Sequence, residues 1–140
     1  MVKLIDNLPL AMQESIDTLK HCADKQQCLE RAYQILAGKY HGDLLKTYTR
    51  FWLVFERDLD KLWNRSGFMH CTNVNYLLRT LLVKSGFFVK ADIRLRWTLV
   101  WYVSPHQYLQ AKIGDKWINV DIWGGRYGIK LGDYAHGPIL

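Results

Sequence analysis

Cysteine and proline are scarce in this chain, and long apolar runs are missing. Its 140 residues include three cysteines and three prolines. Three cysteines cannot all pair with one another, and no CxxC or Cys/His cluster has the spacing of a zinc site. We therefore predict no metal, and we expect Cys22 and Cys28 to be packing residues. No run approaches the roughly 18 apolar residues that a membrane span requires, so no membrane association is expected.

Targeting signals and phosphate-binding loops are also missing. The N-terminus, MVKLIDNLPLAMQESID, meets acidic residues too early for a secretory signal, which predicts a cytoplasmic protein. Neither G-x-x-x-x-G-K nor G-x-G-x-x-G occurs, and the chain has no internal repeat. We therefore predict no cofactor.

The chain does contain enough apolar residues for a packed core. Hydrophobic residues make up 49% of it and include six tryptophans, which favours a single domain over 1–140. The formal net charge of +6 is uneven, because 1–70 hold ten Lys/Arg against nine Asp/Glu, whereas 71–140 hold nine against four. Such a cationic surface favours an acidic partner. Nucleic acid is the less favoured of these partners, since a charged surface is more often simply solvated.

The N-terminal part, 1–66, is predicted to be helical. Apolar residues recur at helical spacing over 8–22, and Asp24 with Gln27 resembles a capping box for a helix through Ala37. Residues 40–42 are expected to be a connection. Between 43 and 63 the pattern fits one long helix or two broken helices, whose aromatic side chains we expect in the core.

Cys71 opens the predicted core, 67–123, at the start of an amphipathic segment. Apolar residues follow it at the positions of one buried helix face: Val74, Leu77, Leu78, Leu81 and Leu82. Gly86 predicts the end of this helix. Unpaired N–H groups and the positive end of the helix dipole at the first turn favour a thiolate over a thiol. The alternative is a cysteine buried as a small hydrophobic residue.

The chain after this helix is predicted to form strands, followed by an irregular tail over 124–140. Residues 88–95 alternate apolar and polar side chains, and 97–103 form a more uniformly apolar strand that we expect at the centre of a sheet. Two further runs, 106–113 and 116–121, flank Gly114-Asp115 and predict a hairpin. The fold class is therefore α+β, with N-terminal helices and the cysteine-bearing helix packed on an antiparallel β-sheet.

The register of the hairpin decides whether His106 and Asp121 meet. If Ile113 pairs with Lys116, Asp121 lies opposite Tyr108, and His106 lies on the same face. The two are then diagonal neighbours about 7–8 Å apart, within side-chain reach, whereas a shift by one residue puts them on opposite faces. A thiol, an imidazole and a carboxylate are what acyl transfer through sulfur requires. We therefore predict Cys71, His106 and Asp121 as catalytic residues.

The order of these residues and their neighbours resembles the transglutaminase-like superfamily. The resemblance covers the second half of the chain and is carried by Cys71 before Leu77-Leu78-Arg79-Thr80-Leu81-Leu82, Ser85-Gly86-Phe87, His106 with Tyr108, and Trp117-Ile118-Asn119-Val120-Asp121. Three positions depart from the family pattern: Met69 replaces a usual glycine, Thr72 a tryptophan and Ile122 a proline.

The resemblance implies a papain-like layout and cysteine-dependent acyl transfer through a thioester. Cys71 is then the nucleophile, His106 the base and acid, and Asp121 the residue that orients the imidazole. Backbone N–H groups at the start of the cysteine helix are the expected oxyanion donors. A peptide or protein is the expected substrate. Water as acceptor makes a peptidase or amidase, which we favour for so small a domain, and an amine makes a transglutaminase. The alternative is an inactive transglutaminase-like domain that binds a peptide or protein.

Overall fold

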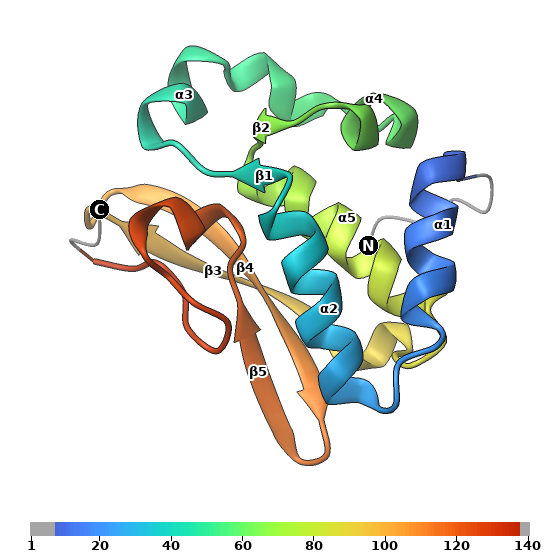
Figure 1. The fold of residues 1–140 in the computed structure, drawn as a ribbon. Helices are drawn as coiled ribbons and strands as arrows, with labels where there is room; N and C mark the ends of the chain where they lie inside the picture. The colour runs from blue at the N-terminus through green and yellow to red at the C-terminus, as the bar shows by residue number, and fades with distance from the viewer. Residues whose placement is uncertain (1–7, 138–140) are drawn as a thin grey trace.

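The structure is a computed structural model that describes residues 8–137 (Figure 1). Residues 1–7 and 138–140 of the predicted domain and tail lie outside the described residues. The α-helices, strands and 3₁₀ helices (η) follow one another as α1 (Leu10–Leu19), α2 (Lys25–Ala37), β1 (Tyr40–His41), α3 (Leu44–Thr49), η1 (Phe51–Phe55), α4 (Leu59–Asn64), β2 (Gly67–Phe68), α5 (Cys71–Lys84), η2 (Lys90–Asp92), β3 (Ile93–Val100), β4 (Ser104–Ile113), β5 (Lys116–Val120) and η3 (Trp123–Tyr127). The predicted α+β class is confirmed, because helices pack on an antiparallel sheet.

The N-terminal helices form where their caps and apolar faces predict. The Asp24 carboxylate accepts the Gln27 backbone N–H at 2.8 Å, and the Gln27 side chain accepts the Ala23 N–H at 2.6 Å, which starts α2. Both α1 and α2 bury one apolar face against the rest of the core. No helix within residues 8–137 combines the length and the apolar character that crossing a membrane requires.

The cysteine-bearing helix α5 is the central support of the fold. It begins at Cys71 as predicted and ends at Lys84, followed by Gly86 at φ +88°. It packs against α2 and against β4, with its apolar residues fully buried: Leu77, Leu78, Leu81 and Leu82. The first turn of α5 is therefore held rigidly relative to the sheet.

The three-stranded sheet has the order β3-β4-β5, so β4 is its central strand. The predicted hairpin between β4 and β5 is confirmed, with Ile113 paired to Lys116 and Leu109 to Val120. Gly114 adopts φ +62° in the two-residue turn, a conformation that glycine enters at little cost. Continuing this register by one residue places Asp121, just beyond β5, opposite Tyr108.

The predictions for the first two strands, 88–95 and 97–103, are both wrong. Residues 88–95 do not form one alternating strand, because Lys90–Asp92 is a 3₁₀ turn in which the Asp92 carboxylate accepts the Val89 N–H, and β3 starts at Ile93. Residues 97–103 are not a central strand either. They end the edge strand β3 at Val100 and then reverse direction through Trp101 and Tyr102, both at positive φ. The apolar character of a run of residues does not reveal that a turn with positive φ interrupts the run.

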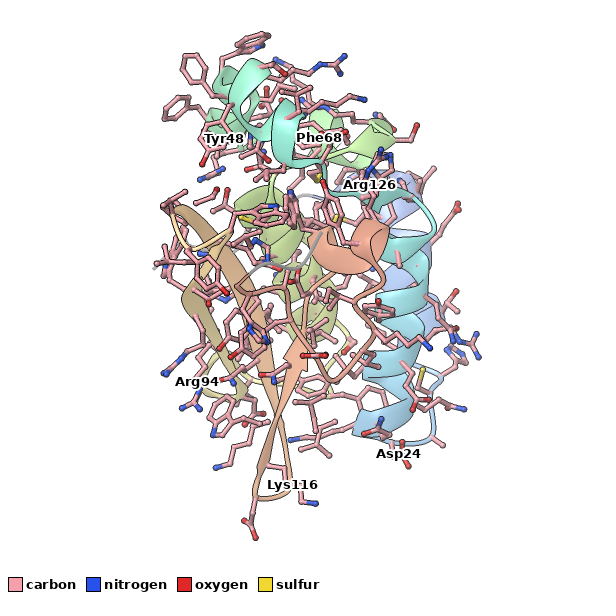
Figure 2. All side chains as sticks on the ribbon, turned by 90° about the vertical axis from the view of Figure 1, so that its left-hand side faces the viewer. Asp24, Tyr48, Phe68, Arg94, Lys116 and Arg126 are labelled. Atoms are coloured by element: carbon pink, nitrogen blue, oxygen red, sulfur yellow. The ribbon has the colours of Figure 1, made fainter. Side chains whose placement is uncertain are left out.

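The segment between 40 and 64 also differs from expectation. Tyr40 and His41 are not a plain connection but form strand β1, which pairs in parallel with β2. The stretch 43–63 forms two short α-helices, α3 and α4, with η1 between them, which agrees with the predicted alternative of two broken helices. Its aromatic side chains were expected in the core, but four of them are more than half exposed: Tyr48, Phe51, Trp52 and Phe55. Figure 2 shows aromatic rings projecting outward around Tyr48.

Candidate active site

Cys71 is the first residue of α5, and its sulfur lies beside β4. His70 is the N-cap residue of this helix, and the Cys71 side chain is half-buried. The backbone N–H of Gln107 in β4 donates to Cys71 Sγ at 3.4 Å. A donor aimed at sulfur stabilises negative charge on it. Cys28, by contrast, is buried beside Ser85, and burial raises the pKa of its thiol.

His106 and Asp121 form a buried pair across the β4–β5 hairpin. His106 Nε2 lies 2.7 Å from Asp121 Oδ2, and the two side chains are only 3% and 1% exposed. Cys71 and His106 line the same small space, and the His106 nitrogen that does not contact Asp121 is the one available to the thiol. The structure therefore brings together all three residues that the sequence singled out.

The Asp121 carboxylate is held by backbone groups that sequence reasoning missed. Oδ1 accepts the Gly124 N–H at 2.9 Å, and Oδ2 accepts the Ala135 N–H at 2.8 Å in addition to the imidazole. A Cβ on Gly124 would lie 2.9 Å from Asp121 Oδ2, so this close approach requires glycine. The Gly124-Gly125 pair just after the strand is the signal that was available in the sequence.

Trp123 is a second residue that sequence reasoning missed. Its ring packs against His106 with ring centroids 4.7 Å apart and excludes solvent from the imidazole. Gly42 makes room for it: a Cβ there would lie 2.3 Å from the Trp123 ring, and the Gly42 N–H donates to the Trp123 carbonyl at 3.0 Å. The available signal was an aromatic residue so close to Asp121 in sequence. The neighbouring residues in the sequence do not show that its ring packs towards β4.

The charge state of His106 follows from these neighbours. Burial by itself lowers the pKa of His106, but hydrogen bonds and negative charge from Asp121 and Cys71 outweigh it and raise the pKa to about 9. The ring is therefore protonated at neutral pH. An imidazolium between a carboxylate and a sulfur can deliver a proton to a leaving group.

The other histidines described in the structure stay outside this constellation. His70 Nε2 bonds to the Thr47 carbonyl at 3.1 Å, and burial lowers the pKa of its ring. His41 is half-buried in β1, His21 is exposed beside the Asp17 carbonyl, and His136 is exposed and packs against Tyr134. Among residues 8–137, no group of three or more His, Cys, Asp or Glu is arranged to hold a metal ion.

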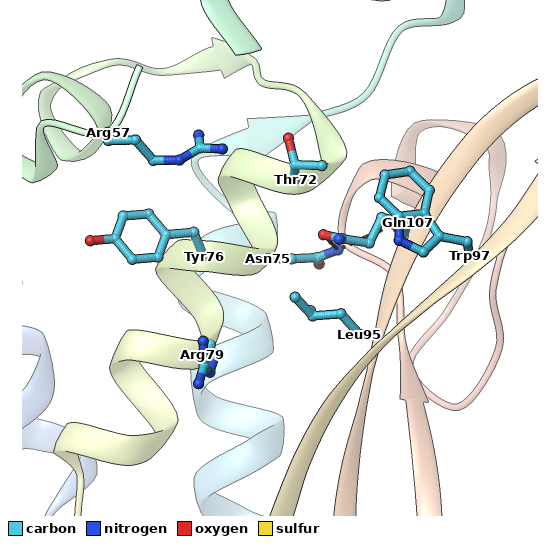
Figure 3. Close-up of a pocket in the computed structure, with 8 residues that line it drawn as sticks. All are labelled: Arg57, Thr72, Asn75, Tyr76, Arg79, Leu95, Trp97 and Gln107. Carbon is cyan, nitrogen blue, oxygen red and sulfur yellow. Dashed lines mark hydrogen bonds between the residues drawn. The ribbon is translucent and has the colours of Figure 1, made fainter. Parts of the chain in front are cut away.

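Two spaces near the site differ greatly in size, and of the two the smaller one is lined by Cys71. The one between Cys71 and His106 has a volume of about 10 Å³, and Leu44 and Thr47 of α3 are among the residues that line it. A hydrogen bond of 2.6 Å between Tyr48 Oη and Ser104 Oγ ties this cover to β4. The other, about 260 Å³, lies beyond Gln107 between α5 and β3 (Figure 3).

Comparisons with known proteins support the fold. No protein-family model and no curated protein matches the chain. A solved crystal structure described as a TGase is similar to it, with a TM-score of 0.55 and 17% sequence identity, over 92% of this chain and 36% of that chain. The chain thus spans about a third of the length of that TGase. At this identity the likeness shows a distant transglutaminase-like fold.

Proposed function

We propose that this protein catalyses cysteine-dependent acyl transfer on amide bonds and acts as a peptidase or amidase. The observation that carries the proposal is the buried Asp121–His106 pair, which lies beside Cys71 at one small space. A nucleophile, a base within hydrogen-bond reach, and a third group that orients the base are the parts that covalent catalysis needs.

In the first step, the Cys71 thiolate attacks the carbonyl carbon of the amide. A C–S bond forms, and the carbonyl oxygen takes the negative charge. His106 then gives its proton to the amide nitrogen, the C–N bond breaks, and the amine leaves a thioester on Cys71. Asp121, held by three hydrogen bonds, keeps the ring oriented throughout. Its buried carboxylate also stabilises the charged form of the ring.

In the second step, water attacks the thioester while His106 accepts its proton. The C–S bond then breaks, releasing the acid and restoring the thiolate beside the imidazolium. The Gln107 N–H, already aimed at the sulfur, and the N–H groups at the start of α5 are the proposed oxyanion donors.

The acceptor in this proposal is water rather than an amine. The closed space between Cys71 and His106 measures about 10 Å³, close to what one water molecule needs and too small for an amine side chain. Transamidation would require α3 to move away from the sulfur.

A second candidate function is peptide or protein binding without catalysis. The exposed aromatic side chains of α3 and η1 favour it, since exposed aromatic residues are enriched at interaction surfaces. This alternative does not need an activated cysteine. The reactivity of Cys71 therefore separates the two functions.

The test is the pH profile of iodoacetamide alkylation at each cysteine, followed by mass spectrometry. We expect Cys71 to react well below pH 8, and faster there than Cys22, which is also half-buried. His106→Ala should move the Cys71 profile to that of Cys22. His136→Ala, which removes an exposed histidine outside the site, should leave it unchanged. A Cys71 profile that matches Cys22 in every variant would contradict the proposal.

A further inference from the structure

The larger space exists because α5 covers only part of the sheet. This helix packs on β4 and leaves the neighbouring side chains of the edge strand β3 uncovered, so Leu95 and Trp97 are 41% and 60% exposed. The result is a groove of about 260 Å³ between α5 and β3. Trp97 forms one wall of it and the first turns of α5 the other, as Figure 3 shows.

This groove begins at the residues that flank the sulfur. Thr72, the next residue after Cys71, lines it, and so does Gln107, whose backbone N–H donates to Cys71 Sγ. The Asn75 amide donates to the carbonyl and to the side-chain oxygen of Gln107, each at 3.2 Å, and so holds Gln107 in place. A ligand in the groove therefore contacts Gln107, the residue whose backbone N–H donates to the sulfur, and Thr72, the residue that follows Cys71.

The charge of the groove is positive. Arg57 and Arg79 line it, and none of the described residues that line it is acidic. The Arg57 guanidinium is held by uncharged acceptors, the carbonyls of Val54 and Glu56 and the Asn73 side chain. Its positive charge is thus positioned at the groove without being neutralised there. Thr72 Oγ1 is buried and has no hydrogen-bond partner among the described residues.

We propose that this groove is the acyl-donor subsite and that it selects a peptide with a carboxylate next to the attacked carbonyl. The proposal rests on the acyl-transfer function above. Arginine is the residue best suited to a carboxylate, because its planar fork donates two parallel hydrogen bonds. Trp97 and Leu95 then contact the apolar stem of the donor, and Thr72 offers a further hydroxyl.

The experiment measures the affinity of short blocked peptides by calorimetry, with Cys71→Ala protein so that no turnover occurs. The probes are acetyl-Ala-Glu-Ala amide, its Gln counterpart, and acetyl-Ala-Gln-Ala with a free C-terminal carboxyl, which separates a side-chain carboxylate from a terminal one. We expect at least one carboxylate peptide to bind about tenfold more tightly than the Gln amide, the difference between a charge-assisted and a neutral hydrogen bond. This preference should shrink as salt rises.

Arg57→Gln should abolish the preference and leave the affinity for the Gln amide nearly unchanged. Arg57 is exposed, so its replacement spares the core, and thermal unfolding verifies this. Arg31→Gln, which removes an exposed arginine of α2 outside the groove, is the matched control. Equal affinities for all peptides, or a preference that survives Arg57→Gln, would overturn the proposal.

Failure of the acyl-transfer function and failure of the proposed substrate class give different results. If Cys71 alkylates as an ordinary thiol while the preference still depends on Arg57, the groove binds anionic peptides but is not an acyl-donor subsite. If Cys71 is activated and no preference is found, the acyl-transfer function stands and the substrate class proposed for it is wrong.

Discussion

Two segments of this molecule have the same helical apolar pattern and very different surroundings. In α5 the apolar face is fully buried, whereas in the α3–η1 segment, residues 44–55, Leu45 and Phe55 are 73% and 75% exposed. Of the contacts that hold α3–η1 to the rest, several are polar: Tyr48 with Ser104, the Thr47 carbonyl with His70, and the Leu53 carbonyl with Asn73. Periodicity thus predicts a helix and an apolar face, but it does not show what covers that face.

The largest expected effect is on the free energy of unfolding, when a core position of α5 is compared with an exposed position of α3–η1. Leu78→Ala removes a fully buried side chain of α5 and should lower the free energy of unfolding by about 2–5 kcal/mol. Phe55→Ala should change it by no more than about 0.5 kcal/mol, because its ring is mostly in water. Urea unfolding of both variants measures the difference. A loss of several kcal/mol for Phe55→Ala would mean that its ring is buried in solution.

The pH dependence of stability should show opposite signs for two histidines, His106 in the candidate site and His70 outside it. The pKa of folded His106, about 9, lies above its ordinary value of 6.5. Its contribution is therefore complete below pH 6.5 and is lost as the pH rises through 9, on the order of 3 kcal/mol in the free energy of unfolding. His70 contacts α3, and burial lowers its pKa, so its contribution is present above pH 6.5 and is lost as the pH falls below that value.

Urea unfolding between pH 5 and pH 10 measures both effects. His106→Gln should flatten the fall in stability between pH 6.5 and pH 9, and His70→Gln should flatten only the fall on the acid side. An alkaline fall that persists unchanged in His106→Gln would contradict the charged state assigned to this ring.

The smallest expected effect concerns the cover over the sulfur. Tyr48→Phe removes the hydrogen bond to Ser104 and should loosen α3 by about 1 kcal/mol, which corresponds to about fivefold faster alkylation of Cys71. The midpoint of the pH profile should not move, because access changes and the charge of the site does not. Tyr102→Phe, at an exposed tyrosine of the β3–β4 turn, is the control. Unchanged alkylation in Tyr48→Phe would mean that this bond does not limit access to the sulfur.

Much of the candidate site was predictable because it depends on short-range rules. The two-residue turn at Gly114-Asp115 predicted the hairpin, and of the registers that the sequence left open the structure has the one that puts His106 and Asp121 on one face. The apolar spacing after Cys71 predicted the start of α5. The catalytic roles of these residues remain predictions, which the alkylation profile tests.

The supporting groups were not predictable, because they come from parts of the chain that meet only in the folded state. The Ala135 N–H reaches Asp121 from the tail, Gly42 admits the Trp123 ring, and Gln107 presents its backbone N–H to Cys71. No local pattern marks a backbone donor for a particular partner. The same holds for the groove, which depends on how much of the sheet α5 leaves uncovered.

By itself the sequence determined the helix at Cys71, the hairpin that carries His106 and Asp121, and the α+β class, because side-chain periodicity and turn chemistry act between residues close in the chain. Only the tertiary structure decided that β3 lies at the edge of the sheet, that the aromatic side chains of α3 and η1 face solvent, and that two arginines line a groove between α5 and β3. Burial and charge are properties of neighbours in space, and those neighbours are set by the packing of distant segments.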